Sequence, residues 1–196
     1  MKPYSQSCDQ NRDPILNVIL PLFANKKNIL EVGSGTGQHA VYFAKKMPHL
    51  NWQTSDQQEY HEGIKQWLSE AALSNTPPPL RLNVSQDNWP NLEIDAIFSA
   101  NAVHIMSWEN VTDFINKAGK LLTPNDLFVL YGPFNYGGNY TSESNARFDS
   151  WLKQQDPNSG IRDFEAIDTL AKAAGMYLQQ DIKMPANNRI LCWKKR

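Results

Sequence analysis

The chain has 196 residues and a formal net charge of −1, and 41% of its residues are hydrophobic. This length suits a single domain whose core is large enough to fold without disulfides or a structural metal ion. The balanced charge excludes the basic field that nucleic-acid binding requires, so we expect no nucleic-acid partner. Two cysteines and four scattered histidines form neither a disulfide framework nor a metal-ligand pattern, so we expect no metal. No signal peptide and no apolar run of about 18 residues is visible, which predicts a soluble, cytoplasmic protein without a membrane partner.

Taken in order, the hydrophobic pattern predicts helices and strands in alternation. Asp13-Pro14 has the form of an N-cap followed by proline at the first helical position, which predicts a helix of roughly ten residues. Apolar runs predict strands at residues 29–32, 51–55, 80–84, 94–99 and 127–131. Helical spacing predicts helices that include residues 40–47, 59–72, 111–122, 148–152 and 164–174, and two final strands follow at 177–183 and 189–193.

This order of elements predicts an α/β fold. Alternating strands and helices imply a parallel sheet with helices on both faces. The last two strands are joined by a short turn, and a parallel pair would need a crossover of a dozen or more residues, so we expect an antiparallel C-terminal hairpin.

Three glycines follow the first strand at alternate positions, Gly33, Gly35 and Gly37. Glycine permits positive φ and lets a ligand approach the backbone, and the free N–H groups of a helix N-terminus favour an anionic group. The stretch therefore predicts a nucleotide-type cofactor site, with a generic strand–helix turn as the alternative. The dinucleotide fingerprint would require glycine where Gln38 stands, which disfavours a nicotinamide oxidoreductase.

The pattern Glu31-x-Gly33-x-Gly35-x-Gly37 resembles motif I of class I S-adenosylmethionine (SAM) methyltransferases. This resemblance implies SAM as the cofactor, bound at the loop that also contains Ser34 and Thr36. It implies a Rossmann-like, seven-stranded, mostly parallel sheet with an antiparallel C-terminal hairpin and helices on both faces, which is the fold predicted above.

Further cofactor-binding candidates end the neighbouring strands, where ligands of such sheets lie. Asp56 follows Gly35 by about 20 residues, a position from which an acid accepts hydrogen bonds from ribose hydroxyls; a solvated loop aspartate is the alternative. The resemblance implies that Glu31 supports the loop and the amino group of the cofactor's methionine part. It also places Asn83 and Val84 at the adenine, although many family members have an acid at the first of these positions.

Candidate residues for the methyl acceptor follow the fourth and fifth strands. Asn101 could position cofactor or acceptor, and His104 has an ordinary pKa of about 6.5 that suits proton removal. The alternative for His104 is a histidine hydrogen-bonded within this rim. Phe134 and Tyr136 are candidates to flank the substrate or to catalyse, or else to pack in the core.

Two segments are predicted to complete the substrate side of a single domain that covers residues 1–196. Residues 1–24 are expected to form an N-terminal lid and helix, with Asn11 and Arg12 as substrate candidates, although unanchored termini are often disordered. Residues 135–160 are expected to form a substrate-side insertion. Asn188, in the turn before the last strand, is a further substrate candidate or a turn residue.

Longer motifs resemble the methyltransferase-like 26 family over nearly the whole chain. They are Ser7-Cys8-Asp9-Gln10-Asn11-Arg12-Asp13-Pro14-Ile15-Leu16, Asn101-Ala102-Val103-His104-Ile105, Gly132-Pro133-Phe134, Gly160-Ile161-Arg162-Asp163-Phe164 and Met184-Pro185-Ala186-Asn187-Asn188-Arg189. The resemblance supports the fold and the cofactor and implies no established substrate. The sequence thus predicts a SAM-dependent methyltransferase that acts on a small molecule, with a non-catalytic SAM-binding or protein-interaction module on the same scaffold as the alternative.

Overall fold

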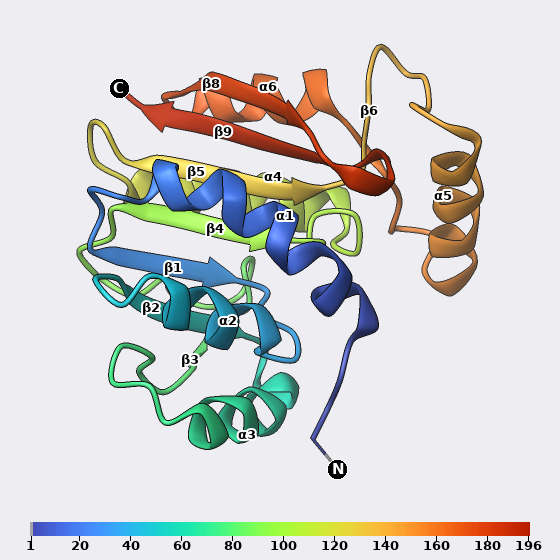
Figure 1. Cartoon of the computed structure of the whole chain (residues 1–196). Helices are drawn as coiled ribbons and strands as arrows, with labels where there is room; N and C mark the ends of the chain where they lie inside the picture. The colour runs from blue at the N-terminus through green and yellow to red at the C-terminus, as the bar shows by residue number, and fades with distance from the viewer. Residues whose placement is uncertain (1) are drawn as a thin grey trace. The chain divides into compact units, whose positions relative to one another are not determined.

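The structure is a computed structural model that describes residues 2–196. These residues fall into two compact units, one that ends at Phe98 and one that comprises Ser99–Arg196. Figure 1 shows the elements of both units in chain order. Each unit is built around part of one sheet whose strand order is β3-β2-β1-β4-β5-β9-β8.

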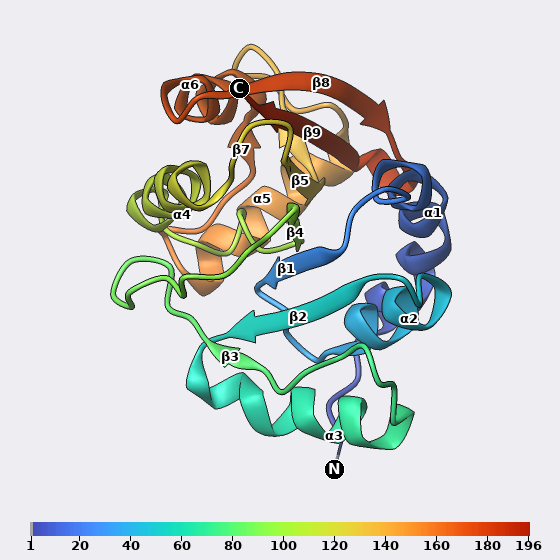
Figure 2. The same cartoon turned by 90° about the vertical axis from the view of Figure 1, so that its left-hand side faces the viewer.

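The first unit alternates helices with parallel strands. Its elements are α1 (Gln6–Leu22), β1 (Asn28–Val32), α2 (Gln38–Lys46), β2 (Asn51–Asp56), a 3-10 helix (Gln58–Tyr60), α3 (His61–Ala71), β3 (Leu80–Arg81) and the start of β4 (Ala96–Ala100). β1 pairs in parallel with β2 on one side and β4 on the other, and Figure 2 shows β1, β2 and β3 side by side. β1 is therefore the central strand of this unit, and the loop that follows it lies between two neighbours.

Aromatic side chains fill the space between α2 and these strands. The rings of Phe43, Trp52 and Phe98 lie with centroids 5.5 to 5.8 Å apart and are fully buried. Each such side chain removes roughly 150–250 Å² from water, so three together dominate the local core. This packing holds the first turn of α2 at the end of β1.

The second unit ends in an antiparallel arrangement. Its elements are α4 (Trp108–Leu121), β5 (Leu127–Gly132), β6 (Phe134–Asn135), α5 (Glu143–Gln155), β7 (Arg162–Asp163), α6 (Phe164–Ala173), β8 (Met176–Lys183), a 3-10 helix (Pro185–Asn187) and β9 (Arg189–Lys195). β9 pairs antiparallel with both β5 and β8, and Figure 2 shows β8 beside β9. A separate two-stranded sheet joins β6 and β7 in parallel.

The predicted fold class is confirmed by this architecture. The seven-stranded, mostly parallel sheet and the C-terminal hairpin are both present. The small sheet of β6 and β7 was not predicted, because two-residue strands leave no hydrophobic period to detect. None of the helices in residues 2–196 combines the length and the apolar character needed to cross a bilayer.

The predicted start of the first helix is wrong. The helix begins at Gln6, and Pro14 lies inside it together with Pro21. Proline lacks an N–H and normally ends a helix, but here Ile15 and Ile19 bury one face of the helix completely, and burial of two such side chains stabilises it by roughly 3–6 kcal/mol. Tertiary packing therefore outweighs the local signal.

The third strand is shorter than predicted. It ends at Arg81, and the chain then turns, because the carboxylate of Asp87 accepts a hydrogen bond of 2.7 Å from the N–H of Asn83. Asn83 itself accepts from Ser85 and Gln86. These local bonds compete with strand pairing and end the strand early.

Candidate functional site

The loop after β1 adopts a conformation that requires its three glycines. Gly33, Gly35 and Gly37 have φ values of 76°, 54° and 87°, in the left-handed region that other residues rarely adopt. The N–H groups of Gly33 and Ser34 both donate to the carbonyl of Ser55, at 3.0 and 3.1 Å. A Cβ added at Gly35 would meet no atom within 4 Å, so the middle of the loop faces free space that a ligand can occupy.

Glu31 is a buried acid directly below this loop. It is only 2% exposed, and one carboxylate oxygen, Oε2, accepts from the Ser34 hydroxyl at 3.0 Å and from the Trp52 indole at 3.1 Å. Burial raises the pKa of Glu31 to about 7, while the bonds from Trp52 and Ser34 act in the opposite direction. A cationic group placed beside Glu31 would restore the ionised form, so this acid suits an ammonium ligand.

Asp56 ends β2, as predicted, and ties that strand to the glycine loop. Its Oδ2 accepts from the N–H of Gly35 at 2.7 Å, and its Oδ1 accepts from the N–H of Gln57 at 2.8 Å. Burial raises the pKa of Asp56, and the two backbone bonds oppose that shift. A carboxylate has about four acceptor positions, so both oxygens can also accept bonds from hydroxyl groups of a ligand.

The N-terminal segment lies against the same loop. Gln38, buried at the start of α2, accepts from the N–H of Ser5 at 2.5 Å and from the Thr36 hydroxyl at 3.1 Å, and it donates to the carbonyl of Ser5. The Cys8 thiol interacts with Thr36 and with the charge of Glu31; burial is the main cause that raises its pKa. The residue that breaks the dinucleotide fingerprint thus anchors the segment predicted to be a lid.

The two N-terminal substrate candidates contribute to helix packing. Asn11 Oδ1 lies 2.7 Å from His39 Nε2, and burial lowers the pKa of His39 to about 4, so the neutral ring donates this bond. Arg12 pairs with Asp9 at 2.6 Å and lies over the ring of Tyr42. Their predicted contact with a substrate stays a prediction.

The two adenine candidates lie in the turn that follows β3. Asn83 Oδ1 accepts three hydrogen bonds from Ser85 and Gln86; its amide nitrogen takes no part in them. Val84 is 7% exposed. Both residues are therefore in the first unit with Glu31, the glycine loop and Asp56.

In the second unit, Asn101 and His104 converge at the end of β5. Asn101 has a φ of 56°, and its N–H donates to the carbonyl of Tyr131 at 2.8 Å. Its Oδ1 and the Nδ1 of His104 would each lie 3.6 Å from a Cβ added at Gly132. Glycine at this position therefore leaves room between the two polar side chains.

His104 is a neutral, buried histidine. It is 3% exposed, and its Nδ1 has no hydrogen-bond partner among the described residues. Burial, with a smaller contribution from the charge of Arg162, lowers the pKa of His104 to about 4. The ring contacts Phe148 edge-on, with centroids 5.3 Å apart.

The remaining substrate and catalytic candidates are engaged elsewhere in the second unit. Phe134 has no exposed surface. The Tyr136 hydroxyl donates to Asp181 at 2.9 Å, and burial and this bond raise its pKa, which does not favour a proton acceptor at neutral pH. The amide of Asn188 donates to the carbonyl of Pro185 in its own turn.

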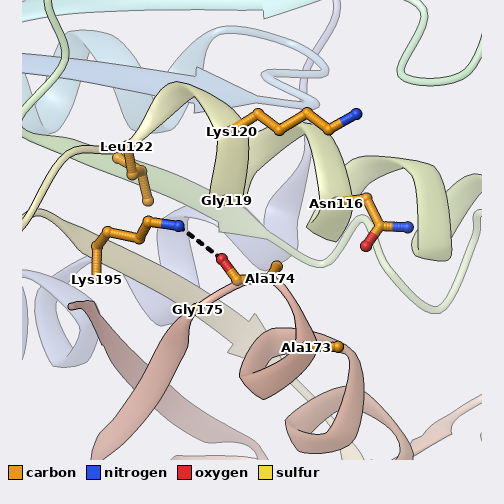
Figure 3. A pocket seen from close by; sticks show the side chains of 8 residues that line it. All are labelled: Asn116, Gly119, Lys120, Leu122, Ala173, Ala174, Gly175 and Lys195. Carbon is orange, nitrogen blue, oxygen red and sulfur yellow. Dashed lines mark hydrogen bonds between the residues drawn. The ribbon is translucent and has the colours of Figure 1, made fainter.

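A cavity of about 640 Å³ lies at the other end of β5 (Figure 3). It is lined by the ends of α4 and α6 and by Lys195, which donates to the carbonyl of Ala174 at 2.7 Å. Lys194 pairs with Leu127, the first residue of β5. Asn101 and His104 lie near Gly132, which is the last residue of β5. The cavity is therefore separate from Asn101 and His104.

Comparison with known proteins gives one family match and many similar folds. A model of the family described as "Protein of unknown function (DUF938)" matches residues 2–195. Among solved structures, an O-methyltransferase family protein from Burkholderia thailandensis is similar with a TM-score of 0.81 and 13% identity, over 96% of this chain and 57% of that one. The SAM-dependent methyltransferase SibL has a TM-score of 0.81 and 19% identity, over 96% and 55%.

A third similar structure is human N-acetylserotonin methyltransferase in complex with SAM, with a TM-score of 0.81 and 14% identity, over 97% of this chain and 53% of that one. At these identities the likeness shows the fold alone. The chain spans a little over half the length of these structures.

Proposed function

We propose that this chain, which belongs to the family of proteins of unknown function DUF938, is a SAM-dependent methyltransferase that acts on a small molecule. In this proposal, residues 1–196 form one methyltransferase domain. The resemblance of its motifs to the methyltransferase-like 26 family supports this assignment and leaves the acceptor open.

The observation that carries the proposal is the pairing of a free glycine loop with two buried acids. Gly35 donates its N–H to Asp56 while its own Cα faces open space. Glu31 lies below the loop with its pKa raised to about 7. A ligand that offers two ribose hydroxyls and an ammonium group meets the needs of both acids.

In this proposal each cofactor-binding candidate of the first unit has a defined role. Asp56 accepts hydrogen bonds from the ribose hydroxyls, and Glu31 attracts the amino group of the methionine part. Ser34 and Thr36 shape the loop, and Asn83 and Val84 contact the adenine. SAM supplies a methyl group to a nucleophile; the protein binds and orients the reactants, which is much of what this reaction needs.

The test is calorimetric titration of the purified protein with SAM and with S-adenosylhomocysteine, with NAD as a control. We expect both adenosyl compounds to bind and NAD not to bind. Asp56→Asn should weaken SAM binding by about 10- to 100-fold, because charge-assisted hydrogen bonds contribute about 1.5–3 kcal/mol.

Glu59→Gln is the matched control, since Glu59 is an exposed acid close to Asp56; it should bind SAM like the unmodified chain. No binding of either adenosyl compound would overturn the proposal. Binding without any methyl transfer to a metabolite panel would favour the non-catalytic SAM-binding module.

A further inference from the structure

Three side chains of the second unit bury polar atoms that have no partner in the described chain. These atoms are His104 Nδ1, Asn135 Oδ1 and Asp163 Oδ1. His104 is 3% exposed and Asn135 is 9% exposed. A buried polar atom without a hydrogen bond destabilises the folded protein, so three in one unit require an explanation.

The backbone brings these three side chains into one neighbourhood. Asn135 and Asp163 are register partners in the parallel pair of β6 and β7. The residues just before Asp163 run along the loop of His104: the N–H of Gly160 donates to the carbonyl of His104 at 2.9 Å, and Arg162 donates to the carbonyl of Val103 at 3.2 Å. The segment 160–163 therefore contacts both the strand of Asn135 and the loop that carries His104.

The side chain of Asp163 does not cap the helix that follows it. Asp163 occupies the N-cap position of α6, where an aspartate normally accepts a bond from the helix N–H groups, but its side chain makes no such bond. Instead Oδ1 is buried and unpaired. An N-cap aspartate that leaves its helix uncapped indicates that its carboxylate serves another group.

The neighbouring segment is held rigidly, so these atoms are not exposed by a loose loop. The buried carboxylate of Asp149 on α5 accepts from the N–H of Ile161, the Tyr140 hydroxyl and the Lys153 ammonium, at 2.6 to 2.7 Å. This fixes residues 160–161 against α5, which also carries Phe148 beside His104.

The chemistry of the three atoms defines the ligand. An ionised carboxylate only accepts hydrogen bonds, and so does an amide oxygen. The neutral His104 ring also accepts through Nδ1 when its proton is on Nε2. A group that donates two or three hydrogen bonds and carries positive charge therefore fits.

We propose that these residues bind the methyl acceptor and that it is a small primary amine. This inference rests on the proposed function for the identity of the methyl donor, but the binding of the amine can be tested without it. The ammonium form would donate to Asp163 and Asn135, a contact that an alcohol or a carboxylic acid cannot match.

The proposed methyl transfer has three steps. The bound ammonium gives one N–H proton to the Asp163 carboxylate, which frees the nitrogen lone pair. The nitrogen forms a bond to the methyl carbon as the carbon–sulfur bond breaks, and the electron pair of that bond stays on sulfur in S-adenosylhomocysteine. The proton on Asp163 then passes to water.

The test is calorimetric titration with 2-phenylethylamine, with 2-phenylethanol as its isosteric alcohol, followed by a panel of primary amines with matched alcohols. We expect amines to bind and their alcohols to bind at least 10-fold more weakly. Asp163→Asn should lower the amine affinity by about 10- to 100-fold. Asp156→Asn, a change of an exposed aspartate near the end of α5, is the matched control and should have no effect.

Each variant is also titrated with SAM, whose proposed ligands apart from Asn101 are in the first unit, and retained SAM binding shows that Asp163→Asn is folded. Failure of every amine to bind while SAM binds would overturn this inference and leave the proposed function intact. Equal amine affinity in Asp163→Asn would overturn it as well. Amine binding without SAM binding would overturn the proposed function and the role of the amine as methyl acceptor, and would leave the amine-binding site itself intact.

Discussion

Glu31 is a residue whose charge depends strongly on its surroundings. Both of its hydrogen bonds reach one oxygen, Oε2, so a glutamine amide oxygen can take over both. Because the folded-state pKa, about 7, is above the ordinary value of 4.5, the folded protein binds more protons than the unfolded chain between these pH values. The free energy of unfolding therefore falls as pH rises through this range, by roughly 3 kcal/mol for this group.

We predict that Glu31→Gln removes this pH-dependent decrease in the free energy of unfolding. Chemical denaturation at pH 5 and pH 8 should show a smaller decrease in the free energy of unfolding for the variant than for the unmodified chain. His39 and His104 have pKa values lowered to about 4, so their contribution has the opposite sign: it is present above about pH 6.5 and is lost as pH falls toward 4. The variant and the unmodified chain share this histidine contribution, so it cancels when their pH dependences are compared. An identical pH dependence in the two proteins would show that Glu31 is ionised at neutral pH when folded.

At the scale of single residues, the sequence predicted where residues lie in the fold better than it predicted their hydrogen-bond partners. Glu31 and Asp56 could be identified because a strand and a glycine loop fix where they lie. In the sequence, Gln38 is only a mismatch to the dinucleotide-binding fingerprint. Its hydrogen bonds to Ser5 could not be predicted, because the two residues are far apart in the chain. Asp163 directly precedes the helix predicted at residues 164–174; the pattern gives its place but not its rotamer, and only the structure shows that its side chain does not cap that helix.

The docking of α1 on α2 is the main feature at the scale of elements. Helix pairs of this kind are held by buried contacts, and here one polar contact is buried among them, from His39 to Asn11 at 2.7 Å. Figure 1 shows α1 leading down to the N-terminal segment near α3, where the Trp67 indole donates to the carbonyl of Pro3 at 2.7 Å. This segment is fixed on two helices of the first unit.

We predict that Asn11→Ala destabilises the protein by about 1–3 kcal/mol, because it leaves the buried His39 ring without an acceptor for its Nε2 proton. Denaturant unfolding at pH 7 measures this change. Gln10→Ala, one residue earlier on the exposed face of the same helix, is the control and should change stability by less than about 0.5 kcal/mol. A loss that is equally small for Asn11→Ala would mean that water replaces the amide.

The sequence could not locate the start of α1, because Asp13-Pro14 is a strong local signal for a helix N-terminus. The residues that decide the outcome, such as Ile15 and Ile19, act through tertiary burial. The same holds for the end of β3, where the side chain of Asp87 turns the chain. Element type followed from hydrophobic period, whereas element boundaries depended on contacts between elements.

At the scale of the whole molecule, the proposed ligands divide between the two units. All proposed contacts to SAM except that of Asn101 come from residues before Phe98, and the proposed amine contacts come from His104, Asn135 and Asp163. The sequence predicted a mostly parallel sheet through its alternation of elements, but it contained no sign of β6 and β7, which bring Asn135 and Asp163 together. Of the three residues in the proposed amine site, the sequence therefore singled out His104 but neither Asn135 nor Asp163.

This division predicts two separate patterns of hydrogen–deuterium exchange. Saturating SAM should slow exchange of the amides in the glycine loop and at Gln57, because a ligand that binds only the native state at 100 times its Kd stabilises that state by about 2.7 kcal/mol. A primary amine alone should slow exchange around residues 134–136 and 160–164. Asp56→Asn should reduce only the first pattern, and Asp163→Asn only the second. If either ligand protected both segments equally, or if SAM protected only the second unit, the assignment of ligands to residues would be wrong.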